Sequence, residues 1–483
     1  MKKILLLISF IALTVSCSDD ITGLNADIKS PTTTEAAFLF TNAQKNLVDQ
    51  MVSTSVNVNV FRLFSQYWTE TTYPDESQYD VATRSIPDNH FRALYRDVLR
   101  DLQESKMLLQ QDLALLPPTA TGAIAIVNNK IAIADVLMCY SYSVLVDTFG
   151  DVPYSESLDI EGHPLPKYDD AKTIYKALIT RLTEDNNKLT SGEASFGDAD
   201  LIYGGDAAKW AKFTNSLRLR MAINMADVDA AYAATEVIAA VNAGVLSSNA
   251  DNTNLNYLGA QPNANPLYAD LVVSGRNDFV PANTLVDKMN GLNDPRRAKY
   301  FTEFNGGFSG GTYGTNNNFA NSSHISETLA DPTFAGTIMD YAEVRFLLAE
   351  AAARGIAITG TAAEHYAAAI TASMENWGVD SGDIANYLAS PSVDYATATG
   401  NWKQKIGEQA WIALYNRGFE GWSSYRRLDY PILAAPAEAD ITQVPTRYTY
   451  PSREETLNGT NVEAAGTAIG GNTLTTKIFW DVN

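Results

Sequence analysis

One short stretch concentrates residues suited to ligand recognition: FSQYWTETTYPDESQYDVATRSIPDN, residues 64–89. Trp68, Tyr73 and Tyr79 lie there among hydroxyls and acids, outside any clean helical period. Tyr and Trp combine an apolar ring with a polar tip, which suits partly solvated surfaces. Flat rings can stack on sugar faces while neighbouring polar side chains bond the hydroxyls. The stretch predicts either a carbohydrate-stacking surface or a set of rings that fastens an irregular segment to the rest of the protein.

Catalytic and metal-binding patterns are sparse. The 4 histidines are scattered, and no HExxH, CxxC, Walker or dinucleotide-binding pattern occurs. Residues 307–311 read GFSGG, which satisfies GxSxG around Ser309. A nucleophile elbow needs a strand before the serine and a helix after it, and TYGTNNNFANSS is a poor helix start, so we interpret the match as chance. We expect no catalytic residue, no metal and no cofactor.

The charge balance narrows the ligand class. The chain carries 56 acidic and 35 basic residues, for a formal net charge of -21. Proteins that track nucleic-acid phosphates normally present a basic stripe, so this balance argues against a nucleic-acid binder. The same balance argues against binding to anionic lipid through a polybasic segment. A carbohydrate or another neutral solute fits better, although net charge speaks mainly to solubility and association.

The N-terminus has the pattern of a secretory signal peptide. Two lysines follow Met1, and residues 4–15 are apolar except for one serine and one threonine. The run is too short to span a bilayer as a helix, which takes about 20 apolar residues. We therefore predict a signal peptide over residues 1–16.

Cys17 directly follows this predicted signal peptide. Residues 13–17, LTVSC, resemble a bacterial lipobox, in which the cysteine receives a diacylglyceryl group and becomes the new N-terminus. Several acyl chains anchor a protein stably where one does not. We predict lipidation of Cys17 and a flexible tether over residues 17–33, which are polar and turn-rich. The alternative is an ordinary signal peptide whose removal leaves a free cysteine.

Helical signals dominate the rest of the chain. Apolar residues recur at helical spacing over residues 34–60, 87–113, 122–149, 169–189 and 205–225. Residues 131–150 are the most apolar, but Asp135 and Asp147 interrupt them, so we predict a buried core helix with Cys139 as a small buried hydrophobe.

Helices resume in the C-terminal third, after a loop-rich stretch. Residues 245–335 are rich in Asn, Gly, Ser and Thr and predict long loops with short helices near 283–290 and 294–300. Residues 341–355 and 362–378 then predict a tetratricopeptide-type hairpin in which alanines allow close contact. Further predictions are helices over 403–415 and 420–428, loop over 447–471 and a short strand over 475–481.

Several long blocks carry a resemblance to a known family. They are FGDVPY (149–154), GGDAAKWAKFTNSLRLRMA (204–222), YAEVRFLLAEAAARG (341–355), WIALYNRGFEGWSSYRRLDYP (411–431) and TTYPDESQYD (71–80). In this order, and behind a lipoprotein start, they resemble the SusD/RagB family. The resemblance implies a mainly α fold of tetratricopeptide-like hairpins, here a single domain over residues 34–483 with the loop-rich insertion at about 245–335.

The resemblance also implies a function and a location. Family members are surface-exposed outer-membrane lipoproteins that bind nutrients, most often glycans and sometimes peptides, and are not catalytic. Each sits as a lid over a SusC-like TonB-dependent transporter. We therefore expect an oligosaccharide-binding lipoprotein that delivers its ligand to such a transporter. The alternatives are a RagB-like peptide binder, a surface hydrolase based on Ser309, and a scaffold that binds only the partner protein.

The blocks that carry the resemblance predict helices and packing more than ligand contact. We expect Trp210, Trp377, Trp411 and Trp422 to be core or helix-contact residues. The segment with Trp68 and Tyr73 belongs to the same pattern, which leaves open whether it faces ligand, transporter or core. Specificity is then expected in the variable loops of 245–335, with these candidate residues: Arg276, Asn277, Tyr313, Asn316 and Phe319.

Overall fold

The computed structural model describes residues 34–482. The predicted signal peptide, Cys17 and the tether lie outside the described residues. From Ala36 onward the chain forms one compact unit. The predicted mainly α fold of tetratricopeptide-like hairpins is confirmed, since long helices follow one another and strands are few and short in the part of the chain that is described.

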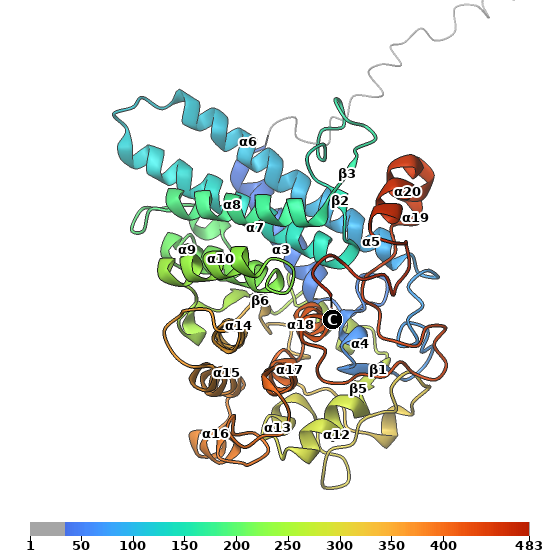
Figure 1. The fold of residues 1–483 in the computed structure, drawn as a ribbon. Coiled ribbons are helices and arrows are strands. Elements are labelled where there is room, and N and C mark those ends of the chain that lie inside the picture. Colours follow the sequence, from blue (N-terminus) through green and yellow to red (C-terminus); the bar gives the residue numbers. More distant parts are fainter. Residues whose placement is uncertain (1–33, 483) are drawn as a thin grey trace, which may run out of the picture. The chain divides into compact units, whose positions relative to one another are not determined.

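Successive helices pack as antiparallel neighbours, which builds the body of the protein (Figure 1). Each long helix from α3 to α10 contacts the next long helix. Helix α14 then packs on α9 and continues the stack with α15, α17 and α18. The helices of the body are α3 (Ala36–Val52), α6 (Arg100–Leu115), α7 (Thr121–Phe149), α8 (Ala171–Lys188), α9 (Ala207–Asn224), α10 (Ala230–Ala243), α14 (Tyr341–Ala353), α15 (Ala362–Asn376), α16 (Ser381–Leu388), α17 (Trp402–Ala413) and α18 (Gly418–Leu428).

Local sequence explains where the hairpin of α14 and α15 begins and why it is tight. Asp340 caps α14 by accepting a hydrogen bond from the Glu343 N–H, and Thr361 with Glu364 forms a capping box on α15. Ala349 on α14 and Ala369 on α15 are both fully buried. Small side chains at these positions let the two helices approach closely.

Helix α7 is the central buried helix. Within residues 34–482 it is the one helix long and apolar enough to satisfy a membrane-span criterion, with a mean hydropathy of 1.5. Every residue from 131 to 149 is buried, including Asp135, Cys139 and Asp147. The prediction of a core helix therefore agrees with its packing against α6, α8 and α9.

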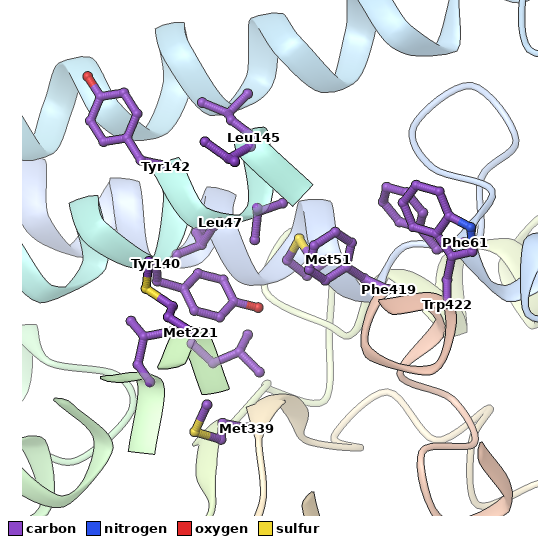
Figure 2. Close-up of a cluster of buried hydrophobic side chains, with 14 of the residues drawn as sticks. Leu47, Met51, Phe61, Tyr140, Tyr142, Leu145, Met221, Met339, Phe419 and Trp422 are labelled. Carbon is purple, nitrogen blue, oxygen red and sulfur yellow. The ribbon is translucent and has the colours of Figure 1, made fainter. Parts of the chain in front are cut away.

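The largest core cluster joins elements that are distant in sequence (Figure 2). Leu47 of α3, Tyr140 of α7, Met221 of α9 and Trp422 of α18 meet with Phe61 in this cluster. Burying such side chains stabilises the fold by about 1.5–3 kcal/mol each relative to exposure. The four tryptophans expected to pack do so: Trp210, Trp411 and Trp422 are fully buried, and Trp377 packs against the core.

Short elements form the loop-rich region and the edges of the body. Three antiparallel pairs join β1 (Trp68–Glu70) with β5 (Phe279–Pro281), β2 (Val152–Pro153) with β3 (Tyr168–Asp169), and β4 (Thr253–Leu255) with β6 (Gly336–Met339). The short helices are α4 (Phe61–Phe64), α5 (Ile86–Arg92), η1 (Ala93–Leu99), η2 (Gly197–Ala199), η3 (Asn249–Asp251), α11 (Pro266–Tyr268), η4 (Ala269–Val273), α12 (Asn283–Gly291), α13 (Arg297–Tyr300) and η5 (Phe319–Asn321).

Two expectations at the C-terminus are wrong. The stretch expected to be loop contains α19 (Ser452–Leu457) and α20 (Gly459–Ala468), and residues 475–481 form no strand. The Asn458 and Asn461 side chains donate hydrogen bonds to the Pro166 carbonyl of a distant loop. The start of α20, which is rich in Gly and Thr and weak in intrinsic propensity, is thus fixed by tertiary contacts.

A buried ionic cluster ties the body helices together. Glu343 of α14 accepts hydrogen bonds from Arg220 of α9 at 2.6 and 2.9 Å and from Arg417 at 2.7 Å. Glu350, about two turns further along α14, accepts a hydrogen bond from Arg427 of α18 at 3.0 Å. Removing one member of such a buried cluster leaves a charge without its partner, which is strongly destabilising.

Candidate functional site

A cavity of about 200 Å³ lies between three segments that are distant in sequence. The first is residues 54–57, after α3, and the second is residues 70–73 at the end of β1, with Arg84 beside it. The third lies between residues 270 and 279, from η4 to β5. Hydroxyl, amide, carboxylate and guanidinium groups dominate the lining. Such convergent hydrogen-bonding groups suit a polyhydroxylated ligand.

Strand pairing brings the second and third segments together. In the β1–β5 register, Trp68 lies opposite Pro281 and Glu70 opposite Phe279. The pairing continues one residue beyond the strands, because the Thr71 N–H donates to the Asp278 carbonyl at 2.9 Å. The Thr71 hydroxyl also donates to the carbonyl of Asn277, 206 residues away in sequence. These bonds place the turn after β1 against the segment before β5.

Tyr73 is the exposed aromatic residue of this cavity. Its side chain is 67% exposed, and its backbone has a φ of 55°. A left-handed backbone at a non-glycine residue costs about 1–3 kcal/mol and persists only where the surroundings hold it. The turn therefore holds a large ring in solvent at the rim of the cavity, an arrangement found at ligand-binding sites.

Arg276 lies across the cavity from this turn, on the loop that leads into β5. Its guanidinium pairs with the Asp278 carboxylate at 2.7 Å, and its side chain is 61% exposed. The Ser274 hydroxyl accepts a hydrogen bond from the Arg276 N–H at 3.1 Å. An exposed ion pair contributes about 0–1 kcal/mol to stability, so these groups are available for exchange with a ligand's hydroxyls.

Burial shifts the pKa values of charged groups in the cavity lining and just behind it. It raises the pKa of Asp270, against the opposing effect of two backbone N–H groups and the nearby Arg62 guanidinium. Burial lowers the pKa of Arg62 to about 10, which leaves this residue a cation at neutral pH. Burial and then the neighbouring Glu76 raise the pKa of Glu70 to about 9. This shift favours the protonated form of the Glu70 carboxyl, which can donate a hydrogen bond.

Three of the candidate ligand residues are buried and pack inside the protein. Trp68 is fully buried and donates its indole N–H to the Tyr415 hydroxyl at 3.0 Å. Tyr313 is buried and donates its hydroxyl to the Leu63 carbonyl at 2.7 Å. Tyr79 is buried as well, and its ring meets Phe64 edge-on. These rings offer no free face to a ligand, and they fasten the irregular segment to the body, which was the second interpretation of residues 64–89.

The remaining candidates are exposed or half-exposed, but only some reach the cavity. Asn277 is exposed between two lining residues and uses its carbonyl to hold the turn after β1. Asn316 is exposed outside the cavity lining. Phe319 stacks on the His324 ring with centroids 3.8 Å apart. The structure thus brings Tyr73, Arg276 and Asn277 together and leaves Asn316 and Phe319 away from the lining.

Several lining residues were not singled out from sequence. The segment STSVNVN after α3 contributes Thr54, Ser55 and Asn57, and Asp270 closes the other side. The helical spacing over residues 34–60 predicted a helix through this segment, but α3 ends at Val52, and the density of Ser and Asn after it was the available signal. Its meaning depends on the β1–β5 pairing, which no local pattern reveals.

The GxSxG match around Ser309 lies in irregular backbone. No strand precedes it and no helix follows it within residues 302–318. The Ser309 N–H donates to the Ser323 hydroxyl, and the Ser323 N–H donates to the Ser309 carbonyl at 2.8 Å. These bonds join two loop segments and do not create a nucleophile elbow.

One buried cluster offers metal-ligand atoms. Those of Asp135, Cys139 and Asp185 lie within 4.8 Å of one another. The Asp135 carboxylate already accepts hydrogen bonds from Lys106 and Arg181. Burial raises the pKa of Cys139, which keeps the thiol protonated, and raises that of Asp185 to about 8. The cluster is balanced by its own cations and protons, so its donor set does not favour a metal ion.

Comparison with known proteins identifies the fold and the family. The sequence matches the SusD-like family described as "Starch-binding associating with outer membrane" over residues 28–451. No curated protein sequence matches the chain. Among solved structures, one titled a chitin-binding protein is similar with a TM-score of 0.79 and 27% identity, covering 93% of this chain and 100% of its own.

Two further solved structures have the same fold over nearly the whole chain. A SusD homolog from Bacteroides uniformis has a TM-score of 0.78 and 27% identity, covering 92% of this chain and 100% of its own. A chitin-binding SusD homolog from Flavobacterium johnsoniae has a TM-score of 0.76 and 25% identity, covering 92% and 98%. With a family match over most of its length and this fold, the chain belongs to the SusD-like family.

Proposed function

We propose that the protein binds an oligosaccharide at the cavity beside Tyr73 and delivers it to a SusC-like TonB-dependent transporter. The exposed Tyr73 ring, held in solvent by a strained backbone at the rim of a polar cavity, is the observation that carries the proposal. A ring in that position can stack on a sugar while the lining groups bond its hydroxyls. Membership of a starch-binding family and the chitin-binding relatives support a glycan ligand.

Binding is tested with a panel of soluble ligands measured by calorimetry. The panel contains chitin oligosaccharides, malto-oligosaccharides and mixed peptides. We expect at least one oligosaccharide series to bind, with an affinity about tenfold weaker in Tyr73→Ala, because aromatic anchors dominate such contacts. Arg276→Ala is expected to weaken binding less.

A matched control separates a local from a general effect. Phe38 on α3 is 66% exposed, a fraction close to that of Tyr73, and it does not line the cavity. Phe38→Ala should keep both the affinity and the thermal midpoint of the wild type. Binding of peptides alone would replace the glycan proposal with the RagB-like one, and equal affinities in Tyr73→Ala and wild type would remove this site.

The proposed setting is the cell surface, with Cys17 as the lipid anchor to the outer membrane. Cys17 lies outside the described residues, so this step rests on the lipobox-like LTVSC and on the family. Palmitate labelling should be lost in Cys17→Ala, and a transporter should co-purify with the wild type. Labelling that survives in Cys17→Ala, or the absence of a transporter, would count against the anchor and the partner respectively.

A further inference from the structure

The turn that presents Tyr73 is fixed at its two ends by different means. At its start, the β1–β5 pairing and the Thr71 bonds hold the chain. The middle of the turn, residues 72–75, is largely exposed, and the chain returns to the interior at Glu76 and Ser77, both buried. The position of Tyr73 therefore depends on what holds this second end.

The Glu70 carboxyl holds the second end. Its Oε2 atom accepts hydrogen bonds from the Ser77 N–H and from the Ser77 hydroxyl, both at 2.9 Å. The Glu76 carboxyl lies beside the Glu70 carboxyl and interacts with it electrostatically. Glu70 is 3% exposed and Glu76 is 1% exposed, so water takes little part in these contacts.

The charges of this cluster require one bound proton. Arg84 pairs with Oε1 of Glu76, while Oε2 of Glu76 is buried and lacks a hydrogen-bond donor. A single guanidinium balances one carboxylate, and two buried carboxylates in contact cannot both stay ionised. A proton carried by Glu70 and donated to the Glu76 Oε2 satisfies both the charge balance and the buried oxygen.

We propose that Glu70 is a positioning residue for ligand binding: its protonated carboxyl ties Glu76 and Ser77 to β1 and thereby fixes the turn that holds Tyr73 at the cavity. This inference rests on the proposed function, since it concerns the same site. Because β1 is itself paired with β5, the clamp also couples the turn to the loop of Arg276.

The electrostatics of the cluster define a pH window for the clamp. Burial, followed by the hydrogen bond and the charge of Glu76, raises the pKa of Glu70 to about 9. The groups that face it are Glu76, Arg84 and Tyr313, with Asp270, Arg276 and Asp278 around the cavity. Below pH 9 the clamp is protonated. As the pH rises through about 9, Glu70 loses the proton beside the Glu76 carboxylate and the turn is released.

The conservative variant separates a proton clamp from simple packing. In Glu70→Gln the amide can donate to Glu76 and its oxygen can accept from Ser77, and the side chain at position 70 no longer titrates. We expect Glu70→Ala to bind the best oligosaccharide of the panel about tenfold more weakly at pH 7, and Glu70→Gln to restore most of that loss. Wild-type affinity should fall between pH 8 and 10, and Glu70→Gln should lack this fall.

Two controls keep the test informative. Glu303 is exposed in a loop outside the cavity lining, so Glu303→Gln should keep the alkaline fall of the wild type. Ser77→Ala removes the hydroxyl that donates to Glu70, and it is expected to weaken binding severalfold. This variant takes the place of Glu70→Ala in the test if Glu70→Ala does not fold. Equal weakening in Glu70→Gln and Glu70→Ala, or an alkaline fall that persists in Glu70→Gln, would overturn the inference.

Measurements without ligand separate this inference from the proposed function. Difference infrared spectra of wild type and Glu70→Gln should show the band of a protonated carboxylic acid in the wild type at pH 7. Amide exchange at Ser77 should accelerate above pH 9 more in the wild type than in Glu70→Gln. Failure of every oligosaccharide to bind would refute the proposed function alone. An ionised Glu70 at pH 7, seen as a missing acid band, would overturn the clamp alone.

Discussion

The helical body and the cavity beside Tyr73 use the same residue types in opposite ways. In the body, Glu343 lies between the Arg220 and Arg417 guanidinium groups, and all three side chains are buried. At the cavity, the Arg276–Asp278 pair is largely in water. The aromatic residues divide in the same manner, since Trp68 is buried while Tyr73, five residues later, is exposed.

This difference separates groups that determine the fold from groups that are available for binding. A buried ion pair is held by low dielectric and fixed geometry, so losing one partner is costly. An exposed pair contributes little to stability and exchanges its partners readily. Composition cannot distinguish the two regions, because both contain arginines, carboxylates and aromatic rings. Burial and satisfaction of hydrogen bonds distinguish them.

The strongest test of the body is Glu343→Gln. It removes the charge that faces Arg220 and Arg417 and leaves two buried cations beside a neutral amide. We expect the free energy of unfolding to fall by about 3–5 kcal/mol, measured by urea denaturation. Asp97→Asn is the control, because its pair with Arg96 is exposed, and it should cost about 0–1 kcal/mol. Similar losses in the two variants would mean that the two kinds of pair do not differ.

Trp68→Ala and Tyr73→Ala compare two aromatic residues of one segment. Trp68→Ala removes a buried ring and the hydrogen bond to Tyr415, and should lower stability by about 3–5 kcal/mol. Its folded fraction should lose less ligand affinity than Tyr73→Ala, since Trp68 does not line the cavity. Tyr73→Ala should change stability by about 0.5 kcal/mol or less. The reverse pattern, with stability lost in Tyr73→Ala and affinity lost in Trp68→Ala, would exchange their roles.

His90 gives the body an acid-sensitive group. The ring is buried against Phe61, Phe149 and Tyr448, and burial lowers its pKa from 6.5 to about 3. A folded-state pKa below the unfolded one means that stability is present above pH 6.5 and is lost as the pH falls toward 3. We expect a loss of about 1.4 kcal/mol per pH unit in that window that is missing in His90→Gln.

Denaturant titrations between pH 7 and 4 measure this difference. His163 is exposed in the loop between β2 and β3, so His163→Gln should keep the wild-type slope. A slope in His90→Gln equal to that of the wild type would show that carboxylates alone account for the acid sensitivity.

The body could be predicted from sequence because its signals are local and repeated. The 3.6-residue period and the caps at Asp206 and Thr361 mark helices whatever the distant contacts are. Helix α20 escaped prediction, since Gly459 and Gly466 weaken it and contacts with the loop before β3 support its start. Asp135 and Asp147 can be buried inside the apolar helix α7 because each accepts a hydrogen bond within the core, from Arg181 and Tyr175 respectively.

The cavity could be predicted only in part. Tyr73 and Arg276 were candidates from residue type, but so were Trp68 and Tyr313, whose burial depends on tertiary packing. The pairing of β1 with β5 joins segments more than 200 residues apart and determines which side chains face the cavity. Glu70 gave no signal in sequence, because its proposed role depends on the approach of Glu76 and Ser77 in the folded protein.

Ser309→Ala is expected to have the smallest effect, and it tests the hydrolase alternative in the loop-rich region. His324, next in sequence to the partner Ser323, stacks on Phe319 and its Nε2 atom bonds the Phe319 carbonyl at 2.9 Å. The loop therefore holds the nearby imidazole in other contacts, and a serine without a base is a weak nucleophile. We expect no release of reducing sugar from the oligosaccharide panel and a stability change within about 0.5 kcal/mol. Hydrolysis by the wild type that disappears in Ser309→Ala would instead make the loop-rich region catalytic, and the comparison with the body would then be between a scaffold and an active site.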